Sequence, residues 1–206
     1  MNLISTNTNS LNGEIICPGD KSISQRILIL DSLLNCDMEI SGFLDADDPN
    51  STLNALNEIG ASIKKIGSKV ILCKRESPFI KPSKNLDLGN SGTGMRLMIG
   101  LISGLGINAT LVGDSSLSKR PMLRVIKPLK EMGAKIQSNE GKCPIEIIES
   151  NISSEFEYKM PIASAQVKSS LILASLSSNN SITIIEPKIT RDHTERMIEY
   201  FGGSVT

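Results

Sequence analysis

Hydrophobic and polar positions along the chain alternate between helical and strand-like periods. Apolar residues at helical spacing follow a polar opening at residues 21–26, and they predict a helix there. These residues are Ile23, Ile27, Leu30 and Leu34. Nearly continuous apolar runs over 97–105 and 167–176 predict two further helices that are buried on most sides. The first opening also reads Ser22-x-x-Gln25, the pattern of a capping box.

A glycine motif recurs three times, about 70 residues apart, which is the mark of an internal repeat. The copies are Asn57-Glu-Ile-Gly-Ala-Ser-Ile63, Lys130-Glu-Met-Gly-Ala-Lys-Ile136 and Glu199-Tyr-Phe-Gly-Gly-Ser-Val205. Each copy follows a helical pattern and precedes an alternating one, as expected of a glycine that ends a helix and leads into a strand.

The other elements complete each unit as β-α-β-α-β-β. The expected strands after the first helices cover 36–42, 107–112 and 181–185, and the expected second helices cover 49–59, 121–132 and 191–201. Hairpins are expected over 63–73, with a turn at Gly67-Ser68, and over 135–148. The units span about 18–75, 86–149 and 155–206. The third stops at Thr206 where its hairpin would begin, which predicts a truncated unit; a degenerate last repeat is the alternative.

Composition narrows the function classes. The chain has 22 basic and 22 acidic residues, 39% hydrophobic and 3% aromatic residues, and no tryptophan. Neutral charge with few aromatic rings argues against a nucleic-acid-binding protein. The single histidine, His193, would have to serve any histidine-based metal site or Ser-His-Asp triad, so neither is expected.

Cysteine usage and the chain start predict the compartment. Four widely spaced cysteines, Cys17, Cys36, Cys73 and Cys143, predict free buried thiols in a reducing environment. The first ten residues lack the regions of a signal peptide, and the longest apolar stretch, 97–107, is too short to span a bilayer. A cytoplasmic protein without membrane contact is therefore expected.

The openings of the three first helices are the candidate binding positions. A helix N-terminus presents unpaired N–H groups and a positive dipole end, which suits anions. Each opening also carries cations: Lys21 and Arg26 in the first, Arg96 in the second and Lys168 in the third. If the units are related by rotation, the openings could converge on one anionic ligand. The alternative is that the polar residues are ordinary N-caps and the cations are solvated.

Two further segments could carry chemistry. Lys119, Arg120 and Arg124 surround a helix start, where the dipole disfavours cations, which suggests an anionic partner. A surface cluster neutralised by Asp114 is the alternative. In the third unit, Asp192 or Thr194 is expected to cap its second helix, and His193 is not expected to be catalytic.

Five motifs in a fixed order resemble the EPSP synthase family of enolpyruvyl transferases, from about residue 13 to the end. They are Pro18-Gly-Asp-Lys-Ser-Ile-Ser-Gln-Arg26, Leu88-Gly-Asn-Ser-Gly-Thr-Gly-Met-Arg96, Lys119-Arg-Pro-Met122, Ser164-Ala-Gln166 and Thr190-Arg-Asp-His-Thr-Glu195. The sibling family acting on UDP-N-acetylglucosamine shares the fold but lacks the Lys-Ser-x-Ser-x-Arg form, so it ranks second.

The resemblance implies an α/β (α+β) fold, an inside-out barrel-like domain of three repeats, and transfer of the enolpyruvyl group of phosphoenolpyruvate to shikimate 3-phosphate. It implies no metal and no organic cofactor. Among the implied ligands of shikimate 3-phosphate, Lys21 also reaches phosphoenolpyruvate and is the implied catalytic residue. The shikimate 3-phosphate ligands are Lys21, Ser22, Arg26, Ser164, Ala165 and Gln166, with Gln166 touching both substrates. The residues that match positions around phosphoenolpyruvate are Asn90, Gly92 and Arg120. Arg96 matches a further arginine of the cleft, and Arg191 matches a position that faces a phosphate.

The resemblance also predicts what this chain lacks. The family's principal acid–base carboxylates lie in a C-terminal half, and residues 1–17 would join the other domain as a strand segment, leaving 18–206 as the three-repeat domain. The chain alone is therefore expected to be inactive. Alternatively it is a non-catalytic anion-binding half that pairs with a separate C-terminal chain.

Overall fold

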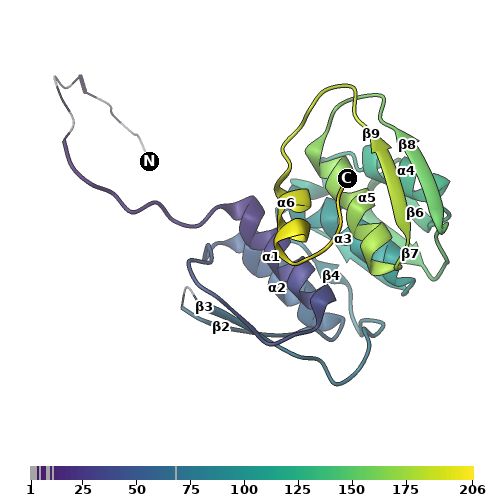
Figure 1. Ribbon diagram of the computed structural model, residues 1–206, viewed down its shortest axis with the longest axis horizontal. Helices are drawn as coiled ribbons and strands as arrows, with labels where there is room; N and C mark the ends of the chain where they lie inside the picture. The colour runs from purple at the N-terminus through teal and green to yellow at the C-terminus, as the bar shows by residue number, and fades with distance from the viewer. Residues whose placement is uncertain (1–3, 5, 8–9, 11, 68) are drawn as a thin grey trace.

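The computed structural model describes residues 4, 6–7, 10, 12–67 and 69–206 (Figure 1). The first unit contains α1 (Lys21–Leu34), β1 (Met38–Ile40), α2 (Asp47–Glu58), β2 (Ser62–Ile66) and β3 (Lys69–Cys73). The second contains β4 (Leu86–Asp87), α3 (Gly92–Leu105), β5 (Ala109–Val112), the 3-10 turn η1 (Leu117–Lys119), α4 (Leu123–Glu131), β6 (Lys135–Asn139) and β7 (Lys142–Ile148). The third contains β8 (Glu155–Lys159), α5 (Ala165–Ser177), β9 (Ser181–Ile185) and α6 (His193–Tyr200).

The sheet topology repeats with the units, which confirms the expected repeat. The sheet orders are β1-β3-β2, β4-β5-β7-β6 and β8-β9. In the first and second units, the strand after the first helix pairs antiparallel with the last strand of the hairpin, as β1 with β3 and β5 with β7. In the second and third units, that strand also pairs parallel with the strand before the helix, as β5 with β4 and β9 with β8. No strand precedes α1 in residues 12–20, and the described residues form three separate sheets with no closed barrel.

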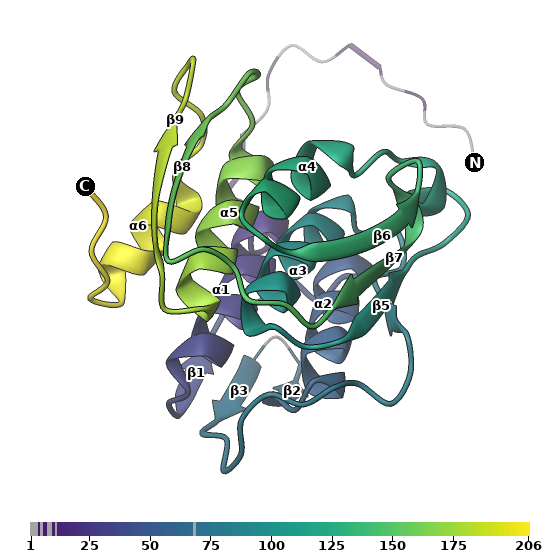
Figure 2. The same cartoon turned by 90° about the vertical axis from the view of Figure 1, so that its right-hand side faces the viewer.

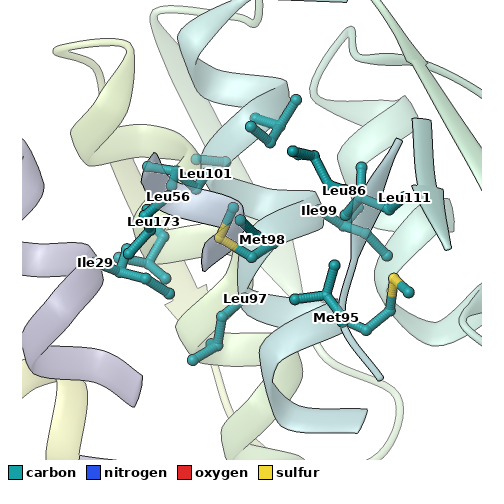
Figure 3. Packing of buried hydrophobic residues seen from close by; sticks show 14 of the residues in the cluster. Ile29, Leu56, Leu86, Met95, Leu97, Met98, Ile99, Leu101, Leu111 and Leu173 are labelled. Atoms are coloured by element: carbon teal, nitrogen blue, oxygen red, sulfur yellow. The ribbon is translucent and has the colours of Figure 1, made fainter. Parts of the chain in front are cut away.

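The helices lie in the centre of the molecule and the sheets lie outside. Figure 2 shows α1, α2, α3 and α5 side by side, with β8–β9 on one flank, β5–β7 on the other and β1–β3 below. Helix α3 is the most enclosed, as its apolar run predicts. Six of its large apolar side chains are fully buried: Met95, Leu97, Met98, Ile99, Leu101 and Ile102. Figure 3 labels the first five of them. A helix that is apolar all round can be stable only in such a central position.

Helices α3 and α5 pack unusually close because glycines line the contact. A Cβ atom placed at Gly100 would lie 2.1 Å from the backbone oxygen of Ser170, and one at Gly104 would lie 2.1 Å from that of Ala174. The Ser170 hydroxyl donates across the contact to the carbonyl of Arg96 at 2.8 Å. The two helices run in the same direction, so this contact also brings their N-termini together.

Helix α1 differs from its expectation in both its cap and its buried face. Asp20 is the N-cap, and its Oδ1 accepts from the backbone N–H of Ile23 at 2.8 Å, so the expected capping box is wrong. Ile23 and Leu34 are 42% and 44% exposed, whereas Leu28 and Ile29 are fully buried. The face of α1 that packs against the neighbouring helices is therefore rotated from the expected apolar stripe and includes Leu28 and Ile29.

Several boundaries and environments also depart from expectation. The expected 121–132 helix begins only at Leu123, and Asp192 makes no side-chain cap bond to α6. The four cysteines are free, as expected, but Cys17 and Cys36 are exposed rather than buried. In the described part of the chain, no helix has the length and apolarity needed to cross a membrane.

Two expectations fall partly on residues that the structure does not describe. The described residues of 1–17 take no helix or strand, and Figure 1 shows them leading away from the rest of the chain. The other residues of this segment, and Ser68 in the expected turn, lie outside the described residues.

Candidate functional site

The openings of α1, α3 and α5 meet, and each pair of helices is joined by a side-chain hydrogen bond. The three bonds are Gln25 Nε2 to Ser91 Oγ at 2.6 Å, Gln166 Nε2 to Thr93 Oγ1 at 2.9 Å and Arg26 Nη2 to Ser169 Oγ at 3.1 Å. The expected convergence of the three openings is therefore present. The positive ends of three helix dipoles face one region, where they favour an anion.

Arg26 is the most constrained cation of this region. It is 5% exposed, and its guanidinium donates only to neutral groups: Thr194 Oγ1 at 2.8 Å, the Ser22 carbonyl at 3.0 Å and Ser169 Oγ. No carboxylate of the described residues forms an ion pair with it. Burial and the nearby charge of Arg191 lower the pKa of Arg26. The charges of Glu195 and Asp20 act in the opposite direction but offset only part of this lowering. A buried cation without an ion-pair partner is costly, so this position favours an incoming anion.

The other positions expected at the first opening are more accessible. The Lys21 side chain is half-exposed, and its Nζ lies 2.8 Å from Asp48 Oδ2 in the first turn of α2. Ser22 is partly buried, and only its carbonyl contacts Arg26. Lys21 is therefore the more accessible cation of this opening, with one carboxylate beside it, while Arg26 is buried.

The second opening places two guanidinium groups around Gly92. Arg96 Nη1 donates to the Gly92 carbonyl at 2.9 Å, and Arg120 donates through Nη2 to the Asn90 side chain. A Cβ atom at Gly92 would lie 3.1 Å from Nη1 of each arginine. The pKa of Arg96 is lowered by burial and then by the charges of Arg120 and Arg124. The loop thus concentrates positive charge around the buried backbone of Gly92.

Asp114 does not neutralise this cluster by an ion pair. Its Oδ1 accepts from the backbone N–H groups of Leu117 at 2.7 Å and Ser116 at 2.9 Å, and its Oδ2 accepts from Asn90 Nδ2 at 2.7 Å. The Leu117 N–H bond is the main cause that lowers the pKa of Asp114. The carboxylate therefore shapes the loop, and the arginine guanidinium groups stay available to a ligand.

The third opening is built differently from its expectation. Ser164 is the N-cap of α5 and accepts from the Val167 N–H at 3.4 Å, while Ala165 begins the helix. Lys168, expected as a free cation, is buried and paired with Glu186 and Glu195, so it is not available to a ligand. Arg191 is exposed in the segment before α6.

The site contains residues that sequence reasoning missed. Gln25, Thr93, Ser169 and Thr194 join the elements around Arg26, and each carries an uncharged polar side chain on a buried helix face. Polar residues within apolar helix runs were the available signal, because a buried polar group needs a partner. Their partners lie up to 168 residues away, so spacing alone could not identify them.

Fold and site together define an α/β repeat protein with a cationic site at convergent helix N-termini. The chain belongs to the EPSP synthase (3-phosphoshikimate 1-carboxyvinyltransferase) family, whose model matches residues 5–206. Similar curated proteins are the 3-phosphoshikimate 1-carboxyvinyltransferases of Petrotoga mobilis, 47% identical over 97% of this chain, and Leptospira biflexa, 46% identical over 94%. A solved EPSP synthase structure from Acinetobacter baumannii superposes with a TM-score of 0.87 at 39% identity over 94% of this chain.

The relatives are much longer than this chain. It covers 47% of the Petrotoga protein, 46% of the Leptospira protein and 44% of the Acinetobacter structure. The chain thus spans about half the length of the relatives that it matches.

Proposed function

We propose that this chain forms the shikimate 3-phosphate-binding part of an enolpyruvyl transferase. In this reaction the 5-hydroxyl of shikimate 3-phosphate gives up its proton to a base as its oxygen bonds to C2 of phosphoenolpyruvate, while the methylene carbon takes up a proton from an acid. The bond between C2 and the phosphate oxygen of the tetrahedral intermediate then breaks, the methyl group loses a proton, and phosphate is released. The reaction class and the assignment of site residues both follow the family resemblance, and the contacts of Arg26 support the assignment.

The observation that carries the proposal is the environment of Arg26. Its guanidinium is buried among neutral acceptors, with Arg191 nearby and with no ion-pair partner in the described part of the chain. A phosphate group would supply the missing negative charge, and helix N–H groups would share it. Ser22, Ser164, Ala165 and Gln166 surround this anion in the proposal, and Arg191 approaches its phosphate.

Phosphoenolpyruvate is assigned to the second opening. Asn90, Gly92 and Arg120 would contact its phosphate and carboxylate, and Arg96 would add charge from one helical turn below. Lys21 is the proposed catalytic residue, because its exposed ammonium can carry a proton between the two substrates. Its bond to Asp48 holds it near the opening before substrates arrive.

We further infer that residues 18–206 act as one three-repeat domain and that a C-terminal half of the enzyme is its partner. The expected acid–base carboxylates belong to that half, so the chain alone should bind substrate without turning it over. Residues 1–17 are proposed to join the partner domain as a strand segment. The proposed location of the assembled enzyme is the cytoplasm.

A titration calorimetry experiment tests the ligand assignment. Shikimate 3-phosphate should bind the chain, UDP-N-acetylglucosamine should not, and Arg26→Ala should abolish the heat. Lys69→Ala is the control, because Lys69 is an exposed strand residue paired with Glu39. Equal binding of both ligands, or unchanged binding by Arg26→Ala, would contradict the assignment.

A phosphate-release assay tests the assembly. The chain with both substrates should release no phosphate above background, and addition of a separately produced C-terminal half of a relative should restore release. Multiple turnovers by the chain alone would overturn the expected inactivity.

A further inference from the structure

Lys168 is a buried cation with two carboxylate partners. Its side chain is 8% exposed, and its Nζ contacts Glu186 Oε1 and lies 2.5 Å from Glu195 Oε1. Lys168 is the fourth residue of α5, where the helix dipole disfavours a positive charge. Burial alone would lower the pKa of Lys168, but the two carboxylates outweigh burial and raise it. The cation is therefore held in place by its partners and not by its own helix.

The two glutamates mark the ends of one connecting segment. Glu186 directly follows β9, and Glu195 is the third residue of α6, so Lys168 holds both ends of residues 186–195. Thr190 Oγ1 donates to the second oxygen of Glu186 at 2.5 Å, which fixes the middle of the segment to the same carboxylate. Arg191 is the next residue, so its backbone position depends on this cluster.

The same cluster also determines where α6 meets the site. Thr194 precedes Glu195 and donates to Ser169 Oγ at 2.7 Å, while it accepts from Arg26 Nε at 2.8 Å. Ser169 in turn follows Lys168 on α5. Two adjacent residues of α5 are therefore bonded to two adjacent residues of α6, one pair charged and one pair neutral.

We propose that Lys168 is a positioning residue, which clamps Glu186 and Glu195 so that Arg191 and Thr194 are set against Arg26 before a ligand arrives. The inference rests on the proposed function, because the site that it positions is the proposed shikimate 3-phosphate site. Lys168 does not contact that ligand itself. Its ammonium is occupied by two glutamates, and replacing it would leave two partly buried carboxylates without a cation.

The test compares Lys168→Met with Lys168→Arg and the control Lys188→Met. Lys188 lies in the same segment but is exposed, so its replacement removes the same charge without touching the clamp. Amide hydrogen exchange of residues 186–195 is measured without ligand, and shikimate 3-phosphate affinity is measured by calorimetry. In Lys168→Met, the amides of residues 186–195 should exchange faster than in the parent. This variant should also bind shikimate 3-phosphate roughly tenfold more weakly, because contacts from misplaced residues lose much of their binding energy. Lys168→Arg should recover most of both properties, and Lys188→Met should match the parent.

Each other outcome overturns the inference. Unchanged exchange in Lys168→Met would show that the clamp does not order the segment, and faster exchange with unchanged affinity would show that the order does not serve the site. If Lys168→Met does not fold, Glu195→Gln replaces it, because this variant keeps the Lys168–Glu186 pair. Absence of binding in the parent and in Lys188→Met alike would be a failure of the proposed function, and the positioning role would fall with it.

Discussion

Arg26 Nε lies 2.8 Å from Thr194 Oγ1, although 168 residues separate them. Arg26 belongs to α1 and Thr194 to the first turn of α6, so this bond joins the first and third repeats. Both side chains are almost completely buried, at 5% and 1% exposure. The charge that the proposed anion would meet is therefore oriented by a helix at the other end of the chain.

Thr194→Val should destabilise the fold and loosen Arg26. The valine leaves the buried Nε and the Ser169 hydroxyl without this partner, and an unsatisfied buried polar group costs roughly 1–3 kcal/mol. Urea unfolding measures the loss, and Thr194→Ser should retain most of the stability because it keeps the hydroxyl. Equal stability of the valine variant and the parent would show that the Arg26–Thr194 bond contributes nothing.

The sequence predicted the repeat because its signals are local. Glycine helix ends, apolar periods and hairpin turns each depend on a few neighbouring residues, and the helices and hairpins that they predicted recur along the chain. The buried face of α1 could not be predicted in this way. Leu28 and Ile29 face the core while Ile23 is exposed, because the surrounding helices determine which face is covered.

The sequence likewise predicted the general nature of the candidate site but not the role of every residue in it. Helix openings with nearby cations indicated an anion site, and the structure does bring the three openings together. The role of Lys168 was not predictable, since its spacing from Ser164 looks the same as that of a ligand-binding cation. Only the distant carboxylates of Glu186 and Glu195 distinguish the two roles.

Gly100→Ala should be strongly destabilising because no space exists between α3 and α5. The new Cβ would lie 2.1 Å from the backbone oxygen of Ser170, so the helices must separate. We expect a loss of about 3 kcal/mol or more in the free energy of unfolding, at the upper end of overpacking effects. Gly67→Ala is the control: nothing lies within 4 Å, and only its positive φ should cost about 1–2 kcal/mol. Equal losses of unfolding free energy in Gly100→Ala and Gly67→Ala would contradict the close contact between α3 and α5.

Gly92→Ala should change binding and leave stability nearly intact. Its Cβ would lie 3.1 Å from the flexible ends of Arg96 and Arg120, which can move away, unlike a helix backbone. Displacing both guanidinium groups should weaken phosphoenolpyruvate binding in the presence of shikimate 3-phosphate, as measured by calorimetry. A stability loss as large as that of Gly100→Ala would show that the arginines cannot yield.

Asp31→Asn should raise stability at neutral pH. Asp31 is 1% exposed, and its Oδ2 has no hydrogen-bond partner among the described residues. Burial raises its pKa to about 6, although the Cys36 thiol, at 3.6 Å from Oδ1, acts in the opposite direction. An unfolded aspartate titrates near pH ~3.9, so the native state binds this proton more tightly, and stability falls as pH rises from about 4 to about 6.

The asparagine variant should lose that slope and gain roughly 1–3 kcal/mol over the parent at about pH 7. Urea unfolding at a series of pH values measures both quantities. Asp45→Asn is the matched control of opposite sign. Asp45 is exposed, and hydrogen bonds from Asn50 and Lys65 lower its pKa. The stabilisation of the fold by the ionised Asp45 carboxylate is therefore lost as pH falls. If Asp31→Asn instead kept the slope of the parent, the buried carboxylate would have to be neutralised by a partner that this structure does not show.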